Sequence, residues 1–411
     1  MPRPTSDCRA TERKHPWPMA RLGDVCEFSR GLTYSKSDEV QFSLNVVLRS
    51  NNVDLETGRL VLDELKYIRD SIEIPTSKRV AKGAILMCTA NGSKQHLGKV
   101  ALIDGDYNYA FGGFMGLLTP NASIDSRYLY WQLMSFEFKR LVTTLTDGAN
   151  INNLKFADIS QFTFLLPPLS EQKEIVARLE RELAAVEKMK KGFEALAETA
   201  KAEFKAELKE VFEELKSGGA ATLQLGDAFK FIDYRGMTPN KIASGVPLIT
   251  AKNIRFGYMD YRERFYISEE DYAKRQTRGV ARCGDILFTT EAPMGYVALA
   301  DQKRFSTGQR IITFQWPNAT EHDNRYFLYY FMSDVFQDQV RENASGATAQ
   351  GIKSSRLVNL SVLIPEMRKQ KVIADRLDLS KARAEKLEAK AREGVAVCET
   401  MRKVILKEAF E

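Results

Sequence analysis

Residues 165–179 read LLPPLSEQKEIVARL, and residues 363–377 read LIPEMRKQKVIADRL. The two stretches lie 198 positions apart and share Pro, Gln, Ile and Arg-Leu at identical spacing. The match extends upstream without a gap, because Gly148-Ala149 is followed 198 positions later by Gly346-Ala347. Similarity at one fixed offset indicates a structural unit that occurs twice in the chain.

Weaker echoes lie further upstream, at offsets that drift slightly. Drifting offsets predict insertions inside each unit, while the ends of the units stay aligned. The matched pairs are Leu22-Gly23-Asp24 with Leu225-Gly226-Asp227, Asn52-Val53 with Asn253-Ile254, the residues 80–86 with 280–287, and Gly98-Lys99-Val100 with Gly295-Tyr296-Val297.

The first part of each unit alternates short β-rich runs with turn residues. In the second unit these runs are Asp285 to Thr289, Gly295 to Leu299 and Arg310 to Gln315. A helical stretch follows in each unit, at about Ser126 to Leu141 and Asn324 to Val340. This mixture predicts a compact α+β domain in each unit.

The second part of each unit is a long amphipathic helix. Pro167-Pro168 excludes helix upstream of the first one, Ser170 is the predicted cap, and Gly218-Gly219 ends it. At 1.5 Å per residue this helix is roughly 70 Å long. Its apolar residues recur every three or four positions: Ile175, Leu179, Leu183, Val186, Met189, Phe193, Leu196, Ala200, Phe204, Leu208, Val211 and Leu215.

The C-terminal helix has a comparable stripe but a weaker start. Arg368-Lys369 carry the wrong charge for a helix N-terminus, so this end is expected to fray or to be held by a partner. A long apolar stripe needs a cover, and the other helix is the simplest one, so we expect an antiparallel coiled coil. The stripe consists of Ile373, Leu377, Ala384, Leu387, Ala391, Val395, Cys398, Met401, Ile405 and Ala409.

The resulting fold prediction is α+β, with two duplicated domains separated by two long helices. The predicted parts are a mobile tail at 1–16, a first domain at 17–167, a central helix at 168–220, a second domain at 221–365 and a C-terminal helix at 366–411.

Composition excludes several classes of protein. The chain has 411 residues and a formal net charge of +6, which permits nucleic-acid binding without requiring it. No apolar run is long enough to cross a membrane and the N-terminus lacks a signal-peptide core, so we expect a cytoplasmic protein. The five cysteines form no C-x-x-C pair and are expected to be buried, reduced thiols: Cys8, Cys26, Cys88, Cys283 and Cys398.

The duplication itself suggests a function. Two domains related by a pseudo-twofold axis match the local symmetry of duplex DNA, and divergent domain interiors predict two different half-sites at a fixed spacing. The alternative that the geometry leaves open is a structural coiled-coil scaffold without DNA sequence specificity.

Several motifs resemble those of specificity subunits of type I restriction–modification systems. The helix entry at Leu165 to Leu179 is one of them. The others are Gly284-Asp285-Ile286-Leu287, then Ala292 to Ala298, then Gly308-Gln309-Arg310. The order of domain, helix, domain, helix matches across the chain after the tail. The second helix entry lacks the Pro-Pro and Ser, and the first domain lacks a clean Gly-Gln-Arg.

The resemblance implies a non-catalytic subunit that directs other subunits to a bipartite, asymmetric target on double-stranded DNA. The partners implied are two methyltransferase subunits and two translocase–endonuclease subunits. S-adenosylmethionine, ATP and Mg²⁺ are then expected on those partners, with no cofactor or metal on this chain. A recognition subunit for a fused methylase–nuclease of another restriction class stays a second alternative.

The sequence offers no convincing catalytic motif. It has no adenine-methylase tetrapeptide and no Gly-x-Gly-x-x-Gly. Gly92 to Lys99 has the wrong spacing for a phosphate loop, and Glu269-Glu270-Asp271 is typical of a solvated helix face or turn.

Candidate DNA contacts are polar and basic side chains in the loops of each domain, which suit base edges and phosphates. The loops 148–153 and 346–351 are instead predicted to have a structural or partner-facing role. The candidates in the first domain are Thr89, Asn91, Ser93, Lys94, Gln95 and Lys99, and those in the second are Thr289, Thr290, Lys303, Arg304, Gln309 and Arg310.

Overall fold

The computed structural model describes residues 17–147, 153–317, 321–346 and 350–410. The chain divides into two compact units, one formed by residues 1–191 with 395–411 and the other by residues 192–394. Each unit therefore combines a globular domain with segments of both long helices. The predicted tail and most of the loops 148–153 and 346–351 lie outside the described residues.

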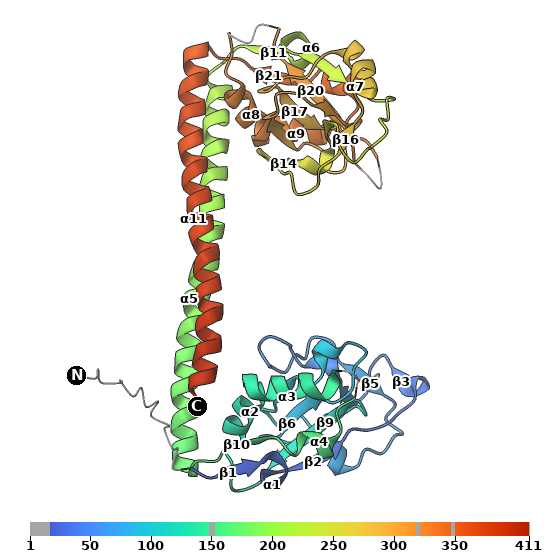
Figure 1. The fold of residues 1–411 in the computed structure, drawn as a ribbon, viewed down its shortest axis with the longest axis vertical. Coiled ribbons are helices and arrows are strands. Elements are labelled where there is room, and N and C mark those ends of the chain that lie inside the picture. Colours follow the sequence, from blue (N-terminus) through green and yellow to red (C-terminus); the bar gives the residue numbers. More distant parts are fainter. Residues whose placement is uncertain (1–16, 148–152, 318–320, 347–349, 411) are drawn as a thin grey trace, which may run out of the picture. The chain divides into compact units, whose positions relative to one another are not determined.

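The globular domain of the first unit is built on two sheets (Figure 1). One is fully antiparallel and has the order β2-β9-β6-β7. The other has the order β3-β5-β4-β8, in which β4 and β8 are parallel. The strands are β2 (Cys26–Arg30), β3 (Glu39–Val40), β4 (Asn45–Leu48), β5 (Lys66–Ile68), β6 (Ile85–Cys88), β7 (Val100–Leu102), β8 (Ala110–Phe111) and β9 (Met115–Pro120).

A separate pair of strands, β1 (Met19–Arg21) and β10 (Thr163–Leu165), joins the two ends of this domain. The largest core of the unit lies between the β2-β9-β6-β7 sheet and the helices, and includes Leu118, Leu129 and Phe138. The helices of the domain are α1 (Leu22–Val25), α2 (Ser126–Met134), α3 (Phe136–Thr146) and α4 (Phe156–Ile159).

The second unit repeats this plan. Its antiparallel sheet has the order β12-β20-β17-β18, the counterpart of β2-β9-β6-β7, and its second sheet has the order β16-β13-β19. The strands are β11 (Thr222–Gln224), β12 (Lys230–Asp233), β13 (Val246–Ile249), β14 (Ile254–Arg255), β15 (Tyr258–Met259), β16 (Tyr266–Ile267), β17 (Ile286–Thr289), β18 (Val297–Leu299), β19 (Ser306–Thr307), β20 (Ile311–Gln315) and β21 (Ser361–Leu363).

The antiparallel pair β11–β21 closes the second domain as β1–β10 closes the first. The α+β class and the duplication are thus confirmed. The helices of this domain are α6 (Leu225–Ala228), α7 (Glu269–Arg275), α8 (Asn324–Met332), α9 (Asp334–Glu342) and α10 (Ser354–Leu357).

The helical stretch predicted as continuous in each domain is two helices. Ser135 separates α2 from α3 with extended backbone (φ −64°, ψ 161°), and its hydroxyl accepts a hydrogen bond from the Phe138 N–H at 3.2 Å. Ser333 breaks the helix of the second domain at the equivalent place (φ −69°, ψ 151°), but its hydroxyl donates to the Tyr330 carbonyl at 2.6 Å and does not cap α9. In both cases the serine hydroxyl binds a nearby backbone group, and such a bond competes with continuation of the preceding helix.

The two long helices are α5 (Leu169–Ser217) and α11 (Met367–Glu408). The predicted end of α5 at Gly218-Gly219 is confirmed, and Gly219 takes the left-handed conformation (φ +70°) that favours glycine at this position. The predicted cap is wrong, because α5 already includes Ser170 in its first turn and the Gln172 N–H donates to the Pro168 carbonyl at 3.0 Å.

The two helices run antiparallel within each unit (Figure 1). In the second unit, Arg376 Nε donates to Glu207 Oε1 at 2.7 Å, and Gly394 faces the ring of Phe193. In the first unit, Lys190 Nζ lies 3.7 Å from Glu399 Oε1. The residue numbers fall on α11 as they rise on α5, as the antiparallel coiled coil requires.

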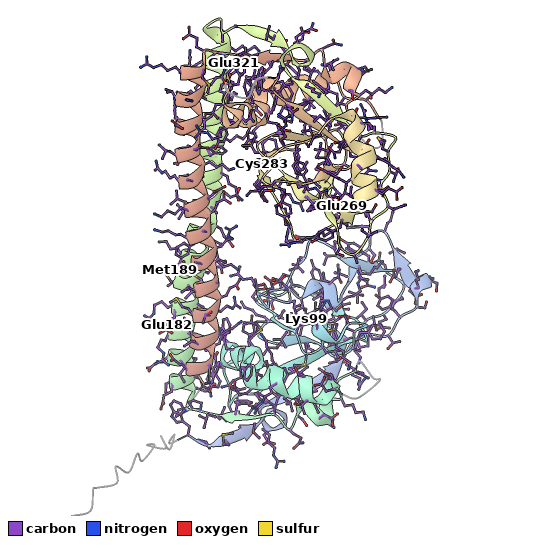
Figure 2. All side chains as sticks on the ribbon, turned by 45° about the horizontal axis from the view of Figure 1, so that its top comes forward. Lys99, Glu182, Met189, Glu269, Cys283 and Glu321 are labelled. Carbon is purple, nitrogen blue, oxygen red and sulfur yellow. The ribbon has the colours of Figure 1, made fainter. Side chains whose placement is uncertain are left out.

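The seam between the helices uses only part of the predicted apolar stripe. Leu179, Val186 and Leu208 are buried, whereas Met189 is 42% exposed (Figure 2). One partner helix covers a narrower band than the stripe of an amphipathic helix, so residues at its edge stay open to solvent.

Three of the four cysteines among the described residues are buried as expected, and burial raises the pKa of Cys26 to about 12. Cys283 is exposed in the turn before β17 (Figure 2), so the prediction of a buried thiol is wrong at this position. In the described ranges no helix is both long and apolar enough to cross a bilayer.

Candidate nucleic-acid interface

In the first domain, the turn between β8 and β9 is Gly112-Gly113-Phe114. It is fixed at both ends, because the Gly112 N–H donates to the Leu48 carbonyl at 2.9 Å. The carbonyl of Phe114 accepts from the backbone N–H and from the hydroxyl of Thr89, each at 3.0 Å. With its backbone held, Phe114 presents its ring outward, and 74% of the residue is exposed.

A cavity of about 840 Å³ opens beside this turn. Asn91 donates through Nδ2 to the Ser50 hydroxyl at 3.0 Å, and the buried Nε of Arg49 has no hydrogen-bond partner. The wall therefore combines amide and guanidinium donors with an exposed aromatic ring. The lining includes Tyr34, Lys36, Glu39, Arg49, Ser50, Asn91 and Phe114.

In the second domain, Gly308-Gln309-Arg310 occupies the equivalent turn, between β19 and β20. The Gly308 N–H donates to the Ile249 carbonyl at 2.7 Å. The carbonyl of Arg310 accepts from the Thr290 N–H at 2.9 Å and from its hydroxyl at 3.3 Å. The Arg310 side chain is 58% exposed, and its Nε lies 3.9 Å from Glu291 Oε2.

The strand before this second turn is anchored by a buried arginine. Arg275 Nε donates to the Ser306 hydroxyl at 2.9 Å, and its other nitrogens donate to the carbonyls of Met237 and Thr307. Its guanidinium lies over the ring of Tyr234, 4.5 Å from the centroid. Thr238 follows Met237 directly, Gln309 lies two residues after Thr307, and the side chains of Thr238 and Gln309 hydrogen-bond each other.

These two turns, alike in backbone and different in side chains, belong to a known type of domain. The family described as "Type I restriction modification DNA specificity domain" matches residues 14–193 and again residues 207–394. The chain belongs to this family.

Similar proteins agree with the family. The type I restriction enzyme EcoKI specificity subunit of Escherichia coli (strain K12) is 24% identical, over 96% of this chain and 88% of that protein. A chain of a solved type I R-M system shares the fold with a TM-score of 0.73 and 20% identity, covering 96% and 97% of the two chains. The HsdS subunit from Thermoanaerobacter tengcongensis follows, with a TM-score of 0.61, 19% identity and 96% coverage of each chain.

The predicted contact residues of the first specificity domain do not form a single cluster. Asn91 lines the cavity beside Phe114, whereas Lys94, Gln95 and Lys99 line a different hollow of about 430 Å³. Lys94 Nζ donates to the Thr146 carbonyl at 2.8 Å. Ser93 is half-buried, and its N–H donates to Asn91 Oδ1 at 2.9 Å.

Lys99 lies within the first specificity domain (Figure 2). Its ammonium donates to the Val53 carbonyl at 2.8 Å, and partial burial lowers the pKa of the amine. A lysine that is half-buried and bound to a carbonyl is a poorer phosphate ligand than a free one, since it must first give up this bond.

In the second specificity domain, the basic candidates are exposed but partly engaged. Arg304 pairs with Glu269 and lies over the ring of Tyr272, 4.7 Å from its centroid, while Lys303 is exposed. Gln309 and Arg310 lie in the turn described above. Glu269, labelled in Figure 2, is the first residue of α7 and belongs to this ion pair. It is exposed, in agreement with the predicted solvated helix face.

The threonines among the candidates have structural roles. Thr89 and Thr290 bind the turn carbonyls, and Thr289 is fully buried, its hydroxyl donating to the Pro293 carbonyl and accepting from the Tyr296 N–H at 2.9 Å. Their burial argues against direct contact with DNA. For the other candidates, contact with DNA stays a prediction.

Sequence reasoning missed Phe114 and Arg49. The missing signal was the equivalence of Gly112-Gly113-Phe114 with Gly308-Gln309-Arg310, which only the matched strand pairing reveals. Val47 and Leu48 pair in parallel with Ala110 and Phe111, as Leu248 and Ile249 pair with Ser306 and Thr307. Among the described residues no three His, Cys, Asp or Glu side chains come close enough to hold a metal ion.

Proposed function

We propose that this chain reads DNA sequence for a type I restriction–modification enzyme, with each globular domain reading one half of a bipartite, asymmetric target. One observation carries the proposal. The two domains hold the same turn by the same hydrogen bonds but present a phenylalanine in one and an arginine in the other. A common scaffold with different exposed side chains is what two different half-sites require.

The partners in this proposal are two methyltransferase subunits and two translocase–endonuclease subunits. The chain itself is not a catalyst, and S-adenosylmethionine, ATP and Mg²⁺ bind to the partner subunits. The duplication supports the paired stoichiometry, because each half of the chain offers an equivalent surface to one copy of a partner. The type of enzyme complex is proposed by similarity to specificity subunits of type I restriction enzymes.

The experiment is a map of N6-methyladenine across the genome of cells that carry this chain and its methyltransferase. The matched control is the same cells lacking this chain alone. We expect a split motif, with one adenine methylated in each half, to disappear from both strands when the chain is removed. An unchanged map, with the complex still folded and assembled, would mean that the chain is a scaffold without sequence specificity.

A recognition subunit for a fused methylase–nuclease would give the same methylation map. Purification of the intact complex separates the two arrangements, because our proposal requires methyltransferase and endonuclease as separate chains. Co-purification with one long chain that carries both activities would overturn this part of the proposal.

A further inference from the structure

The turns that carry Phe114 and Arg310 are equivalent down to single hydrogen bonds. In each domain the first residue of the turn is a glycine that donates to the last residue of the parallel partner strand, over 2.9 Å at Gly112 and 2.7 Å at Gly308. In each domain the third residue offers its carbonyl to a buried threonine, Thr89 or Thr290. The two side chains therefore leave the scaffold from the same place.

This position differs from its surroundings in chemistry. The threonine that binds the turn carbonyl and the glycine that begins the turn are the same residue types in both domains. The third residue of the turn is the apolar Phe114 in the first domain and the cationic Arg310 in the second. The residue after the threonine is Ala90 in the first domain and Glu291 in the second. The scaffold is thus constant where it holds the turn, and it varies where it faces solvent.

An exposed phenylalanine on a rigid turn needs an explanation in terms of a partner. Phe114 is 74% exposed and lies at a cavity whose charged lining residues are Lys36, Glu39 and Arg49. Because Glu39 already pairs with Lys66 at 2.6 Å, the two cations give the surface around the ring a net positive charge. Neighbouring cations favour a polyanion. An apolar ring held among them suits the 5-methyl group of thymine, the apolar feature of the DNA major groove.

The counterpart in the second domain suits a different base. The Arg310 side chain is 58% exposed, and its contact with Glu291 is long, at 3.9 Å. Arginine pairs with O6 and N7 of guanine through two parallel hydrogen bonds. The hydrogen bonds from Thr290 to the Arg310 carbonyl fix the backbone at this residue, which reduces the conformational freedom that Arg310 would lose on binding.

We propose that Phe114 and Arg310 are equivalent base-reading residues, Phe114 for a thymine in one half-site and Arg310 for a guanine in the other. This inference rests on the proposed function, because it assigns each residue to one half of the target. It assigns Thr89, Thr290 and Arg275 a positioning role through the backbone.

The test uses the purified complex of this chain with its methyltransferase. The probes are duplex oligonucleotides that carry the mapped target or a single base-pair change at each position of either half. Phe114→Ala is expected to reduce discrimination at one position of one half-site, and Arg310→Ala at one position of the other, each by roughly 10- to 100-fold. Arg310→Lys, which loses the two-pronged geometry, is expected to be intermediate.

Matched controls separate base reading from general effects of surface change. Phe136→Ala removes another exposed phenylalanine of the first domain, at the start of α3, and Arg341→Ala removes an exposed arginine on α9 of the second domain. Neither control is expected to change discrimination at any position. Thermal unfolding of every variant identifies any that has lost its fold, and Phe114→Leu then replaces Phe114→Ala as the milder change.

The possible outcomes are distinct. Weaker binding that is equal for all oligonucleotides would assign these residues to phosphates and overturn the inference. Unchanged discrimination in folded variants would also overturn it. If the unaltered complex discriminates between no sequences at all, the proposed function itself fails, and this inference fails with it.

Discussion

The side-chain amides of Gln172 and Gln370 share two hydrogen bonds in the two units, and both residues are 0% exposed. In each case Oε1 accepts from the N-cap residue of a domain helix, and Nε2 donates to the proline carbonyl that follows the last strand. Each glutamine therefore ties the first turn of a long helix to its globular domain. The partners are Asp125 at 2.7 Å and Pro167 at 2.8 Å for Gln172, and Asp323 at 3.0 Å and Pro365 at 2.7 Å for Gln370.

This relationship gives a first prediction. Gln172→Glu keeps the shape of the side chain and the acceptor for the Asp125 N–H, but it removes the donor to the carbonyls of Pro167 and Ser123 and buries a carboxylate. A buried carbonyl left without its donor costs about 1–3 kcal/mol of unfolding free energy, and burial of the carboxylate adds to this cost. We expect Tm to fall by roughly 2–4 °C for each kcal/mol lost, as measured by thermal unfolding in circular dichroism.

The control for this change is Gln161→Glu, since Gln161 is an exposed glutamine just before β10. A surface substitution of this kind changes stability by about 0.5 kcal/mol or less. Equal Tm values for the two variants would contradict the role assigned to Gln172.

The sequence predicted the fold well where a pattern repeats and poorly where one residue decides. The shared Gln172 and Gln370 belonged to the repeat, and both long helices followed from their apolar spacing. Local competition at Ser135 and Ser333 was not predicted, because apolar periodicity continues across both serines while their hydroxyls bind the backbone. Helix α11 also starts firmly despite Arg368-Lys369, since Gln370 holds its first turn within the chain itself.

The candidate site was harder to predict for a related reason. Polar residue type selected Thr89, Thr289 and Thr290, but a hydroxyl serves equally well as an internal hydrogen-bond partner, and the structure uses all three inside the fold. Phe114 was passed over because an aromatic residue is normally part of a core. Its exposure depends on the parallel pairing of β4 with β8, residues far apart in the sequence.

The seam between the long helices in the second unit provides a second prediction. A Cβ atom added at Gly394 would lie 2.5 Å from the ring of Phe193, whereas one added at Gly192 would meet nothing within 4 Å. Both residues are inside helices, where alanine is normally more stable than glycine by about 1 kcal/mol. We expect Gly192→Ala to raise the unfolding free energy by this amount.

Gly394→Ala is expected to lower the unfolding free energy instead, by about 1–3 kcal/mol, because the ring must move out of a packed seam. Urea unfolding of both variants measures the difference. The double variant Phe193→Leu with Gly394→Ala should recover most of the loss, and absence of recovery would show that the ring is not the cause.

The third prediction concerns pH. His322 is half-buried, with its ring 3.6 Å from that of Trp316, and burial lowers the pKa of the imidazole below its usual value. Gln370 Nε2 lies 3.1 Å from Nδ1 of His322, and because this amide nitrogen is a donor, the contact favours the neutral ring.

A basic side chain, such as an imidazole, binds fewer protons in the folded state when its pKa there lies below its value in the unfolded state. Its contribution to stability is therefore complete above the unfolded pKa, about 6.5, and is lost as the pH falls toward the folded one. We expect Tm to fall between about pH 7 and pH 5, and this fall to be smaller in His322→Asn. A pH profile identical in the two proteins would exclude His322 as the cause.

The last prediction concerns the unread gap between the two half-sites, which we expect the long helices to set. Removing 184–190 from α5 together with 399–405 from α11 deletes seven residues from each helix, a number that keeps the apolar stripe in phase. These segments lie beside each other in the first unit, where Lys190 pairs with Glu399 at 3.7 Å. Seven residues correspond to about 10 Å of helix, or roughly three base pairs of DNA.

Methylome mapping should therefore show the same two half-sites with a different gap. A variant of full length, with the exposed residues of the same segments changed, should keep the original gap. A shortened chain that folds, assembles and still methylates the original spacing would show that the helices do not set the gap.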